Sequence, residues 1–242
     1  MVLAAGRGER MRPLTDTAPK PMLAVQGKPL LHWHLTALAQ GGVRHAVVNT
    51  AWLGHQIPAQ TGFEWNGLHL SYSMEGQDFG NALETAGGIA RALPLLDEVF
   101  WVAAGDVFVP GFVYDPAALN RFSNSAMLAH LWLVPNPVHH PTGDFGLSAQ
   151  GLALNLPQQS GMQRYTYSTI GLYRRKFFEQ PLCDIPLGNP QGTRAALGPM
   201  LRRAMDAGQV SAEIYPGPWT DVGTPERLAQ LNAEPHPSGS GV

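Results

Sequence analysis

The stretch that most constrains the fold lies near the amino terminus and reads Leu3-Ala4-Ala5-Gly6-Arg7-Gly8-Glu9-Arg10-Met11-Arg12-Pro13-Leu14-Thr15, followed by Pro19-Lys20-Pro21-Met22-Leu23. Its apolar start predicts a short strand, and the small residues that follow let backbone N–H groups approach a ligand closely. Arg10, Arg12 and Lys20 add cationic donors around that space. The stretch therefore predicts an anion-binding loop that suits a nucleoside triphosphate.

Two other glycine motifs do not fit this loop. No Gly-Lys-Ser/Thr follows, as a Walker A loop requires, and Met11 occupies the place of the third glycine in the dinucleotide fingerprint. Taken alone, Gly6 and Gly8 are more typical of a turn. Because Arg10 and Lys20 accompany them, we favour the anion-binding interpretation.

Composition limits the classes of function. The chain has 242 residues, a formal net charge of -2 and 14% charged residues, so it lacks the basic surface that nucleic-acid binding needs. A single cysteine, Cys183, excludes an internal disulfide and a thiolate zinc cluster and fits a reducing compartment. The sequence contains no secretion-signal pattern and no apolar run that would span a membrane. We expect a cytoplasmic monomer.

The first 105 residues alternate between strand and helix patterns. After the opening strand come a helix over 29–40, closed by two glycines, and a second helix over 84–93. Short apolar runs predict strands at 46–49, 68–72 and 99–104. This order predicts an α/β fold with a Rossmann-like, open and mostly parallel sheet flanked by helices.

The second half is less regular. An apolar strand is predicted over 127–134, and a small antiparallel region facing the substrate is predicted from segments around 144–148, 152–156 and 168–173. Helices are expected over 194–207 and 224–232. We interpret 1–232 as one domain with halves of about 1–115 and 116–232, and 233–242 as a disordered tail.

Two aspartates each end an apolar run beside glycine, Asp106 in Ala104-Gly105-Asp106-Val107 and Asp221 in Trp219-Thr220-Asp221-Val222-Gly223. Either one alone is more typical of a turn or a helix cap. Ligands of open α/β sheets bind at the carboxyl ends of strands, and Mg²⁺ prefers oxygen ligands. If both runs end at the same sheet edge, the pair predicts a Mg²⁺ site.

Three separated motifs resemble those of the sugar-1-phosphate nucleotidylyltransferases and occur in the family's order over nearly the whole chain. They are the glycine-rich loop, the Gly105-Asp106 pair and the segment Trp219-Thr220-Asp221-Val222-Gly223-Thr224-Pro225. The resemblance implies a GT-A-like fold and transfer of a nucleoside monophosphate from a triphosphate to a sugar 1-phosphate, with release of pyrophosphate. Two segments, 83–89 and 136–145, are most similar to the branch that uses UTP and N-acetylmuramate 1-phosphate in peptidoglycan sugar recycling. The first half is also similar to the branch that uses GTP and mannose 1-phosphate.

The resemblance also implies roles for individual residues. It places Ala5, Gly6 and Gly8 on the nucleotide, Arg10 on the triphosphate and Lys20 between the reacting phosphates. It implies that Asp106, also a catalytic residue, and Asp221 bind Mg²⁺. It implies that Glu75 and the Gly87-Gly88 turn read the base. Three further residues fall near the sugar: Asp144, Gly146 and Gly171.

Two departures from the family pattern matter. Glu9 stands where a small hydroxyl residue is common, so its charge must point away from a triphosphate. The Glu-Lys pair that many members carry in the second half is absent around 156–159, which leaves the second phosphate-binding cation unassigned, with Arg164 or Arg194 as candidates.

The base and the sugar remain open from the residues. A carboxylate at Glu75 only accepts hydrogen bonds, and guanine offers two adjacent donors where uracil offers one. The 139–145 segment favours UTP and a muramic sugar, whose carboxylate would need a cation such as Arg164 or a protonated His139 or His140. We follow the evidence of the 139–145 segment and expect UTP and a muramic sugar.

A catalytically silent regulatory subunit that binds a sugar nucleotide is the alternative of a different class. The presence of Arg10, Lys20, Asp106 and Asp221 argues against it. A zinc enzyme is not supported either, because the nine histidines show no ligand spacing beyond two short pairs.

Overall fold

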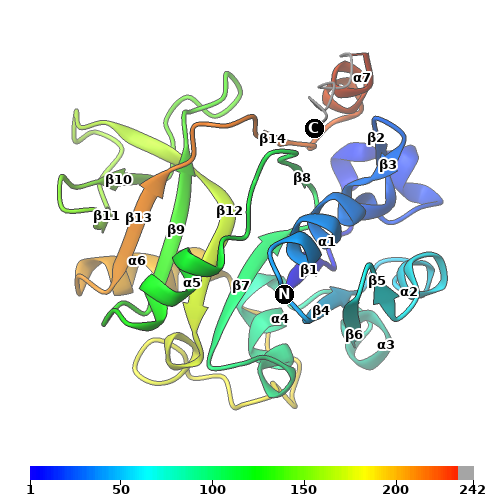
Figure 1. The fold of residues 1–242 in the computed structure, drawn as a ribbon, viewed down its shortest axis with the longest axis horizontal. Coiled ribbons are helices and arrows are strands. Elements are labelled where there is room, and N and C mark those ends of the chain that lie inside the picture. The colour runs from blue at the N-terminus through cyan, green and yellow to red at the C-terminus, as the bar shows by residue number, and fades with distance from the viewer. Residues whose placement is uncertain (234–242) are drawn as a thin grey trace.

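A ten-stranded mixed sheet forms the centre of the molecule, and the computed structural model describes residues 1–233 (Figure 1). The main strand order is β11-β10-β12-β7-β1-β4-β6-β5, and β9 and β13 continue from β12. Its parallel half consists of β1 (Val2–Ala4), β4 (His45–Thr50), β6 (Leu68–Met74) and β7 (Val99–Ala104). The open, mostly parallel sheet predicted for the first half is confirmed.

The other half of the sheet is largely antiparallel. β12 (Arg164–Arg174) pairs with β7 on one side and with β9 (Ala129–Val134) on the other, and β13 (Val210–Ile214) runs parallel to β9. The short strands β10 (Phe145–Leu147) and β11 (Ala153–Leu154) complete it. The predicted strands at 127–134 and 168–173 therefore form, and the latter starts earlier than expected.

Seven helices accompany the sheet within the described residues: α1 (Leu30–Gln40), α2 (Gln56–Thr61), α3 (Glu75–Phe79), α4 (Glu84–Ala92), α5 (Pro116–Ser123), α6 (Leu197–Asp206) and α7 (Pro225–Ala233). Two small two-stranded sheets lie outside the main sheet. One pairs β2 (Ala24–Val25) with β3 (Lys28–Pro29), and the other pairs β8 (Val107–Phe108) with β14 (Thr220–Asp221). β5 (Glu64–Trp65) is an edge strand of the main sheet. Short 3-10 helices span Glu9–Met11, Leu14–Asp16, Lys20–Met22, Leu93–Leu95 and Arg175–Phe178.

Two apolar layers pack against the two faces of the sheet. On one face Leu31 and Leu35 of α1 join Phe122 of α5, and on the other Ile89 of α4 joins Leu201 of α6. Side chains that alternate along a strand serve both layers, since successive residues point to opposite faces. The two layers fix the sheet and hold its strand ends in place.

Two expected segments need comment. The helix predicted from residue 194 begins only at Leu197, because Ala195 is engaged instead with the start of α4, where its carbonyl accepts the Ala86 N–H. Ala233 ends α7 and is not part of a tail, and 234–242 lie outside the described residues. Within residues 1–233, no helix has the length and apolarity needed to cross a bilayer.

Candidate active site

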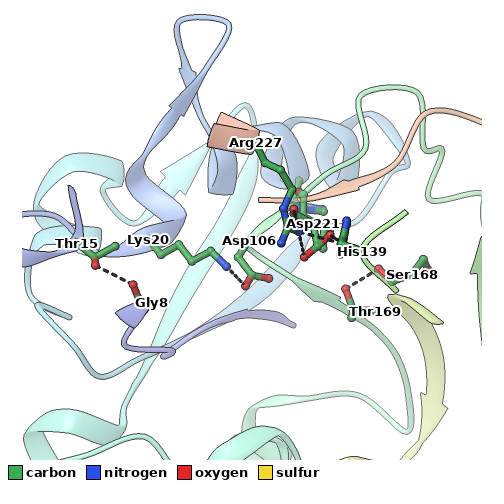
Figure 2. A network of polar contacts seen from close by, with 11 residues as sticks. Gly8, Thr15, Lys20, Asp106, His139, Ser168, Thr169, Asp221 and Arg227 are labelled. Carbon is green, nitrogen blue, oxygen red and sulfur yellow. Dashed lines mark hydrogen bonds and ion pairs between the residues drawn. The ribbon is translucent and has the colours of Figure 1, made fainter. Parts of the chain in front are cut away.

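The loop after β1 folds back on itself. Gly8 has φ +67°, and a Cβ there would lie 3.1 Å from side-chain carbons of both Lys20 and Thr15. The buried Thr15 hydroxyl donates to the Gly8 carbonyl at 2.8 Å (Figure 2). Only glycine combines this conformation with such a close approach, so the sequence pattern at Gly8 has a clear structural reason.

The arginines of this loop differ in their surroundings. Arg7 lies 3.7 Å above the Trp52 ring and donates to the Thr15 carbonyl at 2.9 Å, so it braces the loop. Arg12 is paired with Asp16 at 2.7 Å. Arg10 makes no ion pair within residues 1–233 and lines a cavity beside Lys20, which leaves its guanidinium available to an anion.

Lys20 and Asp106 meet in the cleft. Lys20 Nζ donates to Asp106 Oδ2 at 2.6 Å (Figure 2). Both residues line a cavity of about 220 Å³ together with Ala5 and Gly6. The loop, the lysine and the first aspartate, which are far apart in the sequence, therefore share one space.

Asp221 lies next to Asp106 through the backbone. β14 pairs with β8, and the Val222 N–H donates to the Asp106 carbonyl at 3.0 Å. The Asp221 carboxylate contacts the Arg227 guanidinium of α7 and lies 2.6 Å from His139 Nε2 (Figure 2). The two aspartates are neighbours through the backbone, but Asp221 belongs to the separate two-stranded sheet of β14 and β8 and not to the edge of the main sheet.

The residues at this site fit a hard divalent cation. Asp221 Oδ1 is buried and, despite its closeness to His139, receives no hydrogen bond of acceptable geometry. A carboxylate oxygen of this kind is a ligand that Mg²⁺ accepts. No cluster of three or more metal-ligating residues occurs in the described part of the chain, so a cation held here by Asp106 and Asp221 would also need oxygens from bound phosphates.

Glu75 does not reach the cleft surface. It is fully buried, Asn49 Nδ2 donates to its Oε1 at 2.6 Å, and the Leu83 N–H donates to its Oε2 at 2.8 Å. Burial raises the pKa of this carboxyl above its ordinary value. The structure therefore gives Glu75 a supporting position behind the cavity wall, with no exposed surface to offer a base.

Gly87 and Gly88 are not turn residues. Both are buried within α4, where a Cβ on Gly88 would lie 2.5 Å from Glu75 Oε1 and one on Gly87 would meet the Thr193 carbonyl. They are needed for close packing, and neither lines the cavity.

Asn49 is a cleft residue that the sequence reasoning missed. Its Oδ1 accepts the Ala4 N–H at 2.8 Å, its amide holds Glu75, and it lines the cavity beside Lys20. The signal was present, because Asn49 follows a β-branched run and ligands of α/β sheets gather at strand carboxyl ends.

A second cavity of about 530 Å³ adjoins the first. Leu3, Glu84, Thr85 and Ala104 line both. The remaining lining residues come mainly from the second half: Val102, Asp144, Phe145, Tyr167, Thr169, Ala196, Leu197, Gly198, Leu201 and Arg202.

Among the residues expected near the sugar, only Asp144 lines this cavity. Its Oδ2 accepts the Tyr167 N–H at 2.9 Å, and its Oδ1 lies 3.2 Å from His140 Nε2. Gly146 and Gly171 instead serve packing, because a Cβ would meet Leu156 in the first case and the His130 carbonyl, at 2.9 Å, in the second.

The cation of the second cavity is Arg202 on α6. It donates to Asn155 Oδ1 at 2.8 Å and lies 5.1 Å above the Phe145 ring. By contrast, Arg164 is buried and donates to the carbonyls of Gly143 and Asp144. The sequence signal for Arg202 is weak, because it lies among the apolar positions of α6 and the helical pattern there indicates only the inward face.

His34 supports the edge of the cleft from inside the core. In the neutral ring Nε2 donates to the Val107 carbonyl at 2.9 Å, and Nδ1 accepts from the Tyr114 hydroxyl at 2.9 Å. Burial lowers the pKa of His34 from 6.5 to about 4. The histidine is therefore neutral at pH 7 and holds the residue that follows Asp106.

Comparison with known proteins agrees with this geometry. The family model described as Nucleotidyl transferase matches residues 1–236. The chain is 45% identical over 237 residues to N-acetylmuramate alpha-1-phosphate uridylyltransferase of Neisseria meningitidis serogroup B, covering 96% of each chain. It is 32% identical to the protein of that name from Caulobacter vibrioides, covering 97% of this chain and 94% of the other.

A solved structure shares the fold. It is a Bacillus anthracis protein assigned as a glucose-1-phosphate thymidylyltransferase, in complex with sucrose, with a TM-score of 0.79 and 20% identity. The alignment covers 96% of this chain and 92% of that one.

Proposed function

Because this chain belongs to the Nucleotidyl transferase family, we propose that it transfers UMP from UTP to N-acetylmuramate 1-phosphate and releases pyrophosphate. The observation that carries the proposal is the pair of adjoining cavities, with Lys20 and Asp106 in one and Arg202 in the other. The 45% identity to a uridylyltransferase of this specificity over nearly the full length supports the choice of substrates.

The reaction needs positioning more than acid–base catalysis. An oxygen of the sugar phosphate, already anionic, attacks the α-phosphorus of UTP and forms the new P–O bond. The bond from the α-phosphorus to the bridging oxygen breaks, and pyrophosphate leaves with that electron pair. No general base is required, so catalysis rests on orientation and on neutralising charge.

The residues of the first cavity have matching tasks. The backbone of Ala5, Gly6 and Gly8 would hold the nucleotide, while Arg10 and Lys20 would neutralise the triphosphate and the transferring group. Bound by Asp106 and Asp221, Mg²⁺ would supply further charge neutralisation on the phosphates.

Arg202 supports a muramic sugar. The lactyl group of N-acetylmuramate carries a carboxylate, and Arg202 is the arginine that lines the second cavity. The main residue-level argument for guanine is also weakened, because Glu75 is buried with both carboxylate oxygens occupied. We therefore do not favour GTP with mannose 1-phosphate.

With this substrate, the proposed activity would serve the recycling of peptidoglycan sugars, as the family resemblance implies. We propose that it acts in the cytoplasm, since the single cysteine is free and buried and suits a reducing compartment.

The test is pyrophosphate release by the purified protein with Mg²⁺, using UTP, GTP, dTTP, CTP and ATP against the 1-phosphates of N-acetylmuramate, N-acetylglucosamine, glucose and mannose. We expect release with UTP and N-acetylmuramate 1-phosphate. Release with GTP and mannose 1-phosphate alone would overturn the proposed substrates, and no release with any pair would indicate the silent binding subunit.

A further inference from the structure

Six non-glycine residues in 1–233 adopt a left-handed backbone, in which the Cβ crowds the neighbouring carbonyl: Gln26, Leu53, Asn66, Glu84, Thr169 and Asn189. Two of them, Glu84 at φ +60° and Thr169 at φ +66°, line the cavity of about 530 Å³. Unfavourable backbone conformations concentrated at one cavity point to a role for the side chains there.

Three of the other positions have local explanations. Gln26 and Asn66 each precede a glycine in a two-residue hairpin turn, which requires positive φ at both residues. Thr169 lies where the register of β12 shifts, between Tyr167 and Gly171. Glu84 lies in neither a hairpin nor a bulge.

The backbone around Glu84 is fixed independently of its side chain. The Leu83 N–H donates to Glu75 Oε2 at 2.8 Å, and the Leu83 carbonyl accepts the Ala195 N–H at 3.1 Å. Glycine at position 84 would adopt the same conformation without crowding. The side chain of Glu84 must therefore provide something that the local fold does not need.

The Glu84 carboxylate is accessible. Its side chain is 45% exposed, and its one ion-pair partner among the described residues is Arg194, at 3.3 Å and itself 62% exposed. An exposed pair of this kind contributes little to folding. The carboxylate can therefore accept hydrogen bonds from a ligand.

The location favours the sugar over the nucleotide. Glu84 lines both cavities, and its partner Arg194 stands two residues before Ala196, Leu197 and Gly198, which line only the larger one.

We propose that Glu84 determines specificity for the sugar 1-phosphate. Its carboxylate accepts hydrogen bonds from the hydroxyl or amide N–H groups of the sugar. Arg194 orients the carboxylate and offsets its charge against an anionic substrate. A carboxylate accepts and cannot donate, so it selects for donor groups on the sugar. This inference rests on the proposed function and deepens it.

The test uses Glu84→Gly, Glu84→Gln and the matched control Asn66→Gly, which relieves the same kind of backbone crowding at an exposed hairpin. We expect Glu84→Gly to raise KM for N-acetylmuramate 1-phosphate about tenfold, as loss of one good hydrogen bond implies. Glu84→Gln keeps one acceptor oxygen and should raise this KM less. KM for UTP should stay within about twofold, and Asn66→Gly should change neither. The melting temperature of Glu84→Gly should equal or exceed that of the wild type.

Three results would overturn the inference: an unchanged KM for the sugar phosphate, a rise in KM for UTP alone, or a lower melting temperature for Glu84→Gly.

A binding measurement separates this inference from the proposed reaction. Calorimetry of N-acetylmuramate 1-phosphate, in the presence of the α,β-methylene analogue of UTP, should give weaker binding to Glu84→Gly than to the wild type. Equal binding by Glu84→Gly and the wild type contradicts the role of Glu84. If the wild type binds the sugar phosphate but releases no pyrophosphate, only the proposed reaction is contradicted. If the wild type does not bind it, both are contradicted.

Discussion

Lys20 Nζ and Asp106 Oδ2 lie 2.6 Å apart, although 86 positions separate the two residues in the chain. The lysine side chain is 10% exposed and that of the aspartate 41%. The pair therefore joins a nearly buried cation to a carboxylate that is open to the cleft, beside the loop that follows β1.

Substitution of either member of this pair should abolish most turnover. We expect Asp106→Asn and Lys20→Met each to lower kcat by at least about 100-fold, the usual effect of removing one electrostatic contact to a transition state. The double variant should be less impaired than the product of the two, because the residues act together. Pyrophosphate release under saturating substrates measures the effect, with the exposed Asp97→Asn as control. Wild-type turnover by Asp106→Asn at saturating Mg²⁺ would refute the assignment.

Removal of divalent cations should stop the reaction and leave the fold intact. In the structure Asp106 is balanced by Lys20, and Asp221 by Arg227, so their carboxylates do not require a metal for folding. With EDTA we expect no pyrophosphate release and a melting temperature within about 1 °C of that with Mg²⁺. A large fall in melting temperature would show that the cation is structural.

Arg202→Met should weaken binding of the muramic sugar selectively. A hydrogen bond to a charged partner contributes about 1.5–3 kcal/mol, so we expect KM for N-acetylmuramate 1-phosphate to rise about 10- to 100-fold. N-acetylglucosamine 1-phosphate lacks the lactyl carboxylate, and any turnover of it should be unaffected. Steady-state kinetics with both sugars check this, with the exposed Arg121→Gln as control. Equal effects on the two sugars would argue against a contact with the carboxylate.

Stability should fall in acid through His34. Its pKa in the folded protein, about 4, lies below the ordinary 6.5, so the unfolded chain binds the proton more readily between these values. The contribution of neutral His34 to the free energy of unfolding is complete above about pH 6.5. It falls by about 2–3 kcal/mol as the pH falls toward 4. In His34→Gln, the drop in the free energy of unfolding between pH 7 and 4.5 should be smaller by that amount.

Urea unfolding at the two pH values measures this difference. His69→Gln, which removes an exposed histidine, serves as the control. If the wild type and His34→Gln lose the same stability between these pH values, His34 is not the group responsible.

The short motifs were predictable because each depends on local chemistry. The glycine-rich loop, the alternation of strand and helix, and the two aspartates at the ends of apolar runs all follow from spacing and residue type. Glu75 shows the limit of such reasoning. The family resemblance assigned it to base reading, whereas its burial and its bonds to Asn49 and Leu83 depend on how the ends of β4 and β6 pack against the start of α4.

The sequence by itself determined the parallel α/β half, the glycine-rich loop after β1 and the two aspartates expected to bind metal, because turn chemistry and hydrophobic periodicity act over a few residues. Only the tertiary structure decided that Arg202 is the arginine lining the second cavity, and that Gly87, Gly88, Gly146 and Gly171 serve packing. It also decided that Glu84 lies where the two cavities meet. The physical reason is that these placements depend on contacts between segments far apart in the chain, which no local pattern records.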